Sequence, residues 1–177
     1  MKKILTGVAF GVMVCLLAVW PNTALAQGGF ESATGDAFNK AVPNDFYLEG
    51  NRIPVEKRNA ALLKDAKGQR VVVGLLDTTG YSSQIKQKYS GMLITETKIS
   101  VCGNALGVGS YGFGLDRPAA TSKADATFKL YNQAGEKVGE CASKKDDSIK
   151  MPRPLAVVTA KGGPAKLELG KYVVEIK

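Results

Sequence analysis

The feature that most constrains this chain is a succession of short apolar segments separated by turn residues. Residues 71–76 form a continuous apolar run that ends at Asp77, a pattern typical of a strand buried on both faces. Further on, residues 126–131 and 137–141 flank a turn-forming stretch at 132–135, which predicts a hairpin. About seven or eight strands with turns at this spacing predict an all-β domain, either an antiparallel β-sandwich or a small barrel.

One segment has a helical rather than a strand pattern. Residues 82–89 begin with a serine that can cap a helix, place Ile85 and Tyr89 on one face, and are followed by Gly91, which can end the helix. We therefore expect one short helix within the β domain.

Glycines indicate where the strands turn or lie close to other parts of the chain. Over residues 107–115 glycine alternates with larger residues, which predicts a strand approached closely by another backbone or interrupted by a bulge. Gly103-Asn104 predicts a tight hairpin turn. Gly170-Lys171 predicts a turn or bulge within the last strand, 167–176.

The first 26 residues predict a signal peptide. Lys2 and Lys3 precede an apolar stretch, and Ala24-Leu25-Ala26 is a small-residue cleavage site. A retained membrane anchor is the weaker interpretation, because the apolar stretch ends in Pro-Asn-Thr before that site. A lipid attached at Cys15 is also disfavoured, because the residues before it lack the small residue that attachment requires. The mature protein is therefore expected to be exported, to the periplasm or the exterior, with no transmembrane anchor after cleavage.

Two further regions follow the predicted signal peptide. Residues 27–51 are rich in Gly, Ser, Asn and Ala and show little periodicity, which predicts an irregular N-terminal arm. Residues 52–177 are long enough for one β-sandwich domain with its own core.

Two cysteines remain after the predicted cleavage. Cys102 and Cys141 are an even number in an oxidising compartment, which predicts a structural disulfide between them. The alternatives are a redox-active pair, for which no C-x-x-C motif is present, and free thiols.

The chain is basic, with a formal net charge of +8. This charge favours anionic partners such as phospholipid head groups or acidic glycans. The basic residues are distributed with acidic residues among them, however, a pattern more typical of a solvated surface than of a binding stripe. Nucleic acid is not expected as a partner, because the chain lacks arginines clustered with exposed aromatic residues.

Catalytic, metal and cofactor sites are not expected. The chain has no histidine, the commonest general base and transition-metal ligand. Residues 107–112 match G-x-G-x-x-G, but no helix pattern follows them. Ser83 and Lys86 have the S-x-x-K spacing of penicillin-binding enzymes, but the companion K-[ST]-G strand is missing. Asp77 and residues 146–147 lack the pattern of a calcium loop.

Four segments of the chain are similar to a known group of proteins. Residues 57–63, 88–94, 109–114 and 152–155 resemble an uncharacterised family of small exported bacterial β-sandwich-like proteins. The resemblance implies a compact secreted β domain and no particular activity.

Together these patterns predict a non-catalytic exported binding or structural protein. Its partner would be an envelope component, with anionic components favoured by the positive charge of the chain, or another macromolecule. The alternative function is binding of a small apolar, lipid-like molecule at a barrel or sandwich mouth lined by residues 109–115, with Tyr111, Phe113 and Tyr131 facing the ligand. A third hypothesis is an enzyme or enzyme inhibitor whose site the sequence does not reveal.

Overall fold

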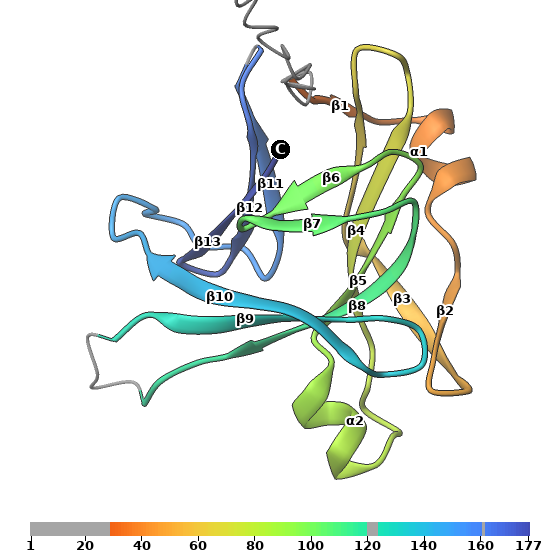
Figure 1. The fold of residues 1–177 in the computed structure, drawn as a ribbon, viewed down its shortest axis with the longest axis vertical. Coiled ribbons are helices and arrows are strands. Elements are labelled where there is room, and N and C mark those ends of the chain that lie inside the picture. Colours follow the sequence, from red (N-terminus) through yellow and green to blue (C-terminus); the bar gives the residue numbers. More distant parts are fainter. Residues whose placement is uncertain (1–28, 120–123, 161) are drawn as a thin grey trace, which may run out of the picture.

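Figure 1 shows the computed structural model, which describes residues 29–119, 124–160 and 162–177. The predicted signal peptide, residues 1–26, lies outside these ranges. The described residues form thirteen strands and two short helices: β1 (Glu31–Ala33), α1 (Asp36–Ala41), β2 (Asp45–Leu48), β3 (Asn51–Lys64), β4 (Arg70–Leu76), α2 (Ser83–Lys88), β5 (Gly91–Thr95), β6 (Ile99–Val101), β7 (Asn104–Leu106), β8 (Gly109–Asp116), β9 (Ala126–Tyr131), β10 (Lys137–Lys145), β11 (Ala156–Thr159), β12 (Ala165–Leu169) and β13 (Tyr172–Ile176).

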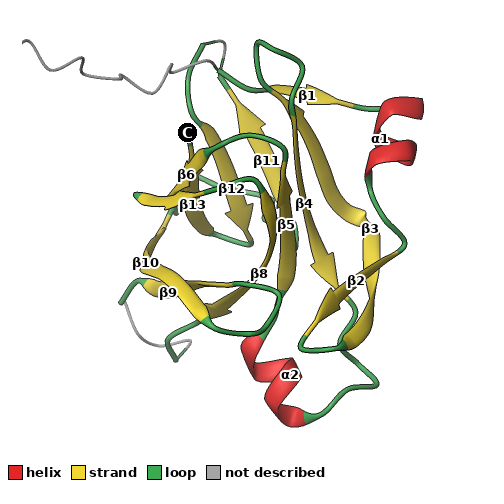
Figure 2. Cartoon of the chain, turned by 45° about the vertical axis from the view of Figure 1, so that its right-hand side comes forward, coloured by secondary structure: helices red, strands yellow, loops and turns green. Residues whose placement is uncertain are grey.

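The strands form one antiparallel, nearly closed barrel. Their order is β1-β3-β4-β5-β8-β9-β10-β13-β12-β11, while β2 pairs with β3 and the short strand β6 pairs with β7 and β13. The last strand in this order, β11, lies against β1 and β3, so the two ends of the sheet approach each other (Figures 1 and 2). The predicted all-β antiparallel class is confirmed, and the barrel-like form is the one observed.

The predicted number of strands is wrong, and hairpins within predicted segments are one reason. The segment 167–176, expected as one strand with a turn or bulge, is a hairpin in which Gly170, at φ 69°, connects β12 to β13. A glycine in the left-handed region reverses the chain at little steric cost.

A second reason is the long strand β3, whose pattern is interrupted. Its pairing with β4 passes from Glu56 opposite Leu75 directly to Ala60 opposite Gly74, so residues 57–59 form a bulge. The polar residues at the bulge break the alternation that identifies strands in a sequence.

The expected irregular N-terminal arm contains regular structure instead. Residues 29–51 include β1 and β2, which both pair with β3, and the short helix α1. In β2 the side chains of Phe46 and Leu48 are buried whereas Tyr47 is exposed. This alternation is too short to be recognised without its partner strand.

Apolar side chains pack on both faces of the barrel wall. Val71 and Val73 of β4 point into the barrel interior, and Val72 and Leu76 pack in a second core outside it. The prediction of a strand buried on both faces is therefore confirmed. Figure 2 shows α1 and α2 outside the barrel wall, and their residues Ala37, Phe38, Ala41 and Ile85 belong to the second core.

The predicted helix is present as α2 and packs closely on β8. Ser82 caps it by accepting a hydrogen bond from the Ile85 backbone N–H, at 3.4 Å, and Ile85 is buried. Gly91 does not end the helix but begins β5. A Cβ atom at Gly114 would overlap the Lys88 carbonyl oxygen, which confirms the expected close approach of another backbone to the glycine-rich strand.

The predicted disulfide joins two hairpins. Cys102 and Cys141 are bonded, with their Cα atoms 6.3 Å apart. The β6–β7 turn is formed by Cys102-Gly103, at φ 53° and 82°, one residue earlier than the expected Gly103-Asn104 turn. The β9–β10 hairpin at residues 132–135 is present as predicted.

Candidate functional site

The three aromatic residues expected to face a ligand do not line a common opening. Phe113 is fully buried in the barrel interior, where its ring stacks on that of Phe128 with centroids 5.3 Å apart. Tyr111 is half-buried and donates a hydrogen bond to the Gly107 carbonyl oxygen, at 3.1 Å. Tyr131 belongs to the core outside the barrel, on the opposite face of the sheet.

Side chains fill the interior of the barrel. The residues packed there come from strands all around the sheet and include Val71, Leu93, Leu106, Phe113, Phe128, Leu130, Leu167, Val174 and Ile176. An apolar ligand at the centre of the barrel would have to displace these side chains.

Glu49 is the centre of a polar cluster that connects the β2–β3 turn to the end of α2. Both elements lie at the lower end of the barrel in Figure 1. Glu49 and Gly50 lie at φ 49° and 75° in the hairpin turn, and the Glu49 N–H donates to the Gln133 carbonyl oxygen, at 2.9 Å. Its carboxylate accepts hydrogen bonds from the Tyr89 hydroxyl, at 2.7 Å, and from Lys88. One residue, through its backbone N–H and its carboxylate, thus joins two hairpins and a helix.

The electrostatics of this cluster keep its groups in fixed protonation states. Hydrogen bonds from Lys88 and Tyr89 lower the pKa of Glu49, and burial, with the Glu49 hydrogen bond, raises the pKa of Tyr89. The Lys88 ammonium also lies 5.3 Å from the centroid of the Tyr89 ring and 5.0 Å from that of Tyr131, close enough for cation–π attraction. At neutral pH the cluster is therefore an ion pair supported by aromatic rings, and sequence reasoning did not identify it.

An open groove of about 800 Å³ lies beside this cluster, between α2 and the β8–β9 pair. The Lys129 ammonium is within 2.5 Å of Asp116, and Lys88 is paired with Glu49. Two of the three cations in the groove are thus engaged by carboxylates. The groove is lined by Gln84, Gln87, Lys88, Leu115, Asp116, Arg117, Lys129 and Tyr131.

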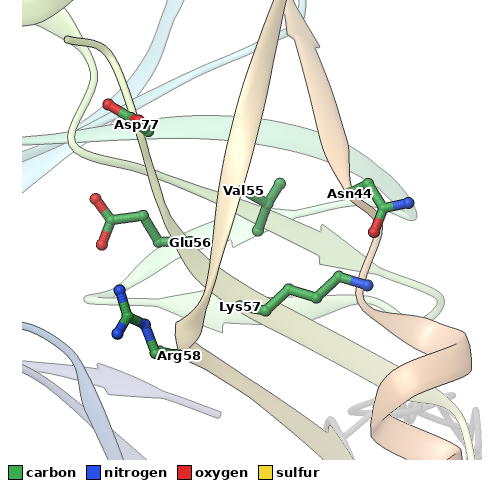
Figure 3. A pocket seen from close by; sticks show the side chains of 6 residues that line it. All are labelled: Asn44, Val55, Glu56, Lys57, Arg58 and Asp77. Carbon is green, nitrogen blue, oxygen red and sulfur yellow. The ribbon is translucent and has the colours of Figure 1, made fainter.

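A second groove, of about 510 Å³, is formed by the bulge of β3 (Figure 3). Glu56 and Arg58 extend to the side of β3 where Asp77 lies, and Lys57 extends toward Asn44 on the other side. Two cations and two carboxylates give this groove no net charge. Val55 completes its lining.

The carboxylates of the second groove have local partners. Glu56 accepts a hydrogen bond from the Asn59 side chain, at 2.7 Å. Asp77, a residue expected in a loop without calcium, accepts one from the Thr79 backbone N–H, at 3.0 Å, and hydrogen bonding to Thr79 lowers its pKa. Each of these carboxylates therefore accepts its hydrogen bond from a residue two or three positions along the chain.

A third feature is a basic surface formed where β10 ends. At the left of Figure 1, the end of β10 and the loop that follows it lie beside the start of β13. The Lys145 and Lys171 ammonium groups lie 3.7 and 3.5 Å from the same oxygen of Asp147. We call the following residues the basic surface: Lys144, Lys145, Lys150, Arg153, Lys166 and Lys171.

Hydrogen bonds hold the segments of the basic surface together. The Asp146 N–H donates to the Lys171 carbonyl oxygen, at 2.7 Å, and the Gly170 N–H donates to that of Arg153, at 2.9 Å. Hydrogen bonding from Ser148, with the nearby charge of Lys166, lowers the pKa of Asp146. Asp147 thus connects Lys145 to Lys171, whereas the Asp146 side chain is bonded within its own turn to Ser148.

Within the distributed positive charge of the chain, the C-terminal part has a local excess of cations. Residues 141–177 contain eight Lys and Arg against four Asp and Glu, half of the net charge of +8 of the whole chain. This bias is visible in the sequence. The pairing of β10 with β13 is not visible there, and it is this pairing that brings Lys144 and Lys145 beside Lys171.

Within the described ranges, no group of three or more Cys, Asp and Glu side chains is arranged to hold a metal ion. Ser83 and Lys86 are both exposed on α2. No helix in the described part of the chain has the length and apolar character needed to cross a bilayer.

Comparison with known protein families, curated proteins and solved structures finds no match to this chain. The functional assignment therefore depends on the chain's own residues.

Proposed function

We propose that this protein is a non-catalytic exported binding protein that attaches to an anionic component of the cell envelope through the basic surface. The observation that carries the proposal is that Lys145 and Lys171 meet at Asp147 where β10 pairs with β13, while Lys166 acts on the neighbouring Asp146. The loop that bears Lys150 and Arg153 is hydrogen-bonded to the same region at Gly170. Phosphate and carboxylate groups are the anions that envelope lipids and polymers present. Cations held together on a rigid scaffold attract such a surface more strongly than the same charges dispersed over a molecule.

Most cations of the basic surface are available to a partner. Among the described residues, no carboxylate forms an ion pair with Lys144, Lys150, Arg153 or Lys166. By contrast, two of the three cations in the groove beside α2 are engaged by carboxylates. The basic surface is therefore a better candidate for anion binding than either groove.

Export and a binding role are supported by independent features. Residues 1–26 have the pattern of a signal peptide, and the Cys102–Cys141 disulfide is compatible with an oxidising compartment. The absence of histidine from the chain removes the commonest catalytic base. The alternative, a carrier of a small apolar ligand, has less support because side chains fill the barrel interior.

The proposal is tested by retention on immobilised dextran sulfate. The surface variant Lys150→Gln/Arg153→Gln/Lys166→Gln is compared with the control Lys40→Gln/Lys86→Gln/Lys98→Gln, which loses the same charge at exposed sites elsewhere. We expect wild type to bind at about 50 mM NaCl, the surface variant to elute at clearly lower salt, and the control to elute close to wild type. Equal elution of the two variants, or no retention of wild type, would contradict the proposal.

A further inference from the structure

Met151 is the most exposed large hydrophobic side chain among the described residues, at 88%. An exposed apolar residue alone is common on protein surfaces and indicates nothing. Its position is unusual, however, because Met151 lies between Lys150 and Arg153, within the basic surface. An exposed apolar side chain thus lies in sequence between two cations, Lys150 and Arg153, that form no ion pair with a carboxylate among the described residues.

The loop that bears Met151 is held at both ends. At its start the Ser148 N–H donates to Asp146 Oδ1, at 2.8 Å. At its end Leu155 is buried in the barrel core, and the Gly170 N–H donates to the Arg153 carbonyl oxygen. The fixed φ angles of the two neighbouring prolines, Pro152 and Pro154, restrict the backbone further. Such a loop presents Met151 to a partner at a low entropic cost.

The chemistry of this loop matches one kind of anionic surface best. Lysine and arginine attract the phosphates of an anionic bilayer, and an apolar side chain gains free energy by entering the boundary between head groups and acyl chains. A polyanionic glycan offers the charge but no apolar phase. The combination of Met151 with its flanking cations therefore favours a lipid bilayer over an acidic polymer.

We infer that the partner of the basic surface is an anionic lipid bilayer and that Met151 inserts into its interface. The inference rests on the proposed function and specifies the partner. The cations contact lipid phosphates while the methionine side chain leaves water. The barrel itself stays outside the hydrocarbon region.

The experiment is co-sedimentation with vesicles of phosphatidylcholine that contain about 30% phosphatidylglycerol, compared with pure phosphatidylcholine vesicles. We expect wild type to bind the anionic vesicles. Met151→Ser should weaken binding about tenfold, because the apolar side chain no longer enters the interface. Met151→Leu should bind like wild type. Val108→Ser, which removes another exposed apolar side chain far from the basic surface in sequence, is the matched control and should have no effect.

The salt dependence provides a second readout. The loss caused by Met151→Ser should persist when the salt concentration is raised, because burial of apolar surface is not screened, whereas the loss caused by Lys150→Gln/Arg153→Gln should diminish. Equal binding of wild type and Met151→Ser would overturn the insertion of Met151. If wild type were retained on dextran sulfate but did not bind anionic vesicles, the lipid partner would be overturned and the proposed function would stand.

Discussion

At the scale of single residues, Glu49 connects three separate elements of the fold. It lies in a hairpin turn, where its backbone N–H is bonded to the β9–β10 hairpin and its carboxylate to Lys88 and Tyr89. Its side chain is only 23% exposed, so water screens these interactions less than those of a surface pair. The cluster thereby stabilises the end of the barrel that α2 covers.

Replacement of Glu49 by glutamine should reduce the free energy of unfolding by about 1 to 2 kcal/mol at pH 7. Because the pKa of Glu49 is lowered in the folded protein, its contribution is complete above the unfolded value of about 4.3 and disappears as the pH falls through the folded pKa. Urea denaturation at pH 7 and at about pH 3 would measure this difference. Glu140→Gln, at a fully exposed ion pair, should have no measurable effect, and equal stability of wild type and Glu49→Gln at pH 7 would contradict the prediction.

At the scale of elements, the close packing of α2 on β8 depends on a missing side chain. Gly114 leaves room for the Lys88 carbonyl at the end of the helix. This contact positions Lys88 and Tyr89 beside Glu49. Two glycines of the pattern at residues 107–115, Gly112 and Gly114, thus leave room for Tyr89 and the Lys88 carbonyl at the end of α2.

Gly114→Ala should destabilise the protein by about 3 kcal/mol, because the added Cβ would meet backbone atoms that cannot move independently. Gly80→Ala is the matched control, since a Cβ there would meet nothing within 4 Å. Thermal unfolding of both variants would test the prediction. A melting temperature of Gly114→Ala equal to that of the control would show that α2 can shift freely.

The disulfide links the β6–β7 hairpin to β10 across 39 residues of sequence. By the chain-entropy argument, closure of a loop of this length stabilises the fold by about 4 kcal/mol, so Cys102→Ala/Cys141→Ala should unfold at a much lower denaturant concentration. Alkylation of the denatured, unreduced protein should label neither Cys102 nor Cys141. Labelling of both would exclude the disulfide.

At the scale of the whole molecule, the distribution of charge is uneven. Half of the net charge of +8 belongs to residues 141–177. The pairing of β10 with β13 and the hydrogen bonds at Lys171 and Arg153 bring most of these cations to one end of the barrel. The protein should therefore approach an anionic surface in one preferred orientation.

Binding to anionic vesicles should weaken by at least about tenfold when NaCl is raised from about 0.05 to 0.5 M, because the Debye length falls from about 14 to about 4 Å. The variant Lys150→Gln/Arg153→Gln/Lys166→Gln should show a smaller salt dependence, since fewer charges remain to be screened. Titration of vesicles at several salt concentrations would measure both slopes. Identical slopes would place the attraction elsewhere on the molecule.

The local patterns of the sequence were sufficient to predict part of the fold. Alternation and apolar runs identify the antiparallel all-β class and the strand at 71–76, turn residues identify the hairpin at 132–135, and a serine cap identifies α2, because each depends on neighbours along the chain. The pairing of Cys102 with Cys141 followed from the predicted signal peptide, which removes the third cysteine and implies an oxidising compartment.

The other features of the fold and of the candidate sites are determined only by the tertiary structure. The bulge at residues 57–59, the pairing of β2 with β3, the near closure of the barrel, the Glu49 cluster and the basic surface all arise from contacts between distant segments. Each contact requires a register that the hydrophobic pattern permits but does not specify uniquely. Lys144 and Lys145, far from Lys171 in sequence, lie beside it because the register of β10 against β13 brings the end of one strand to the start of the other.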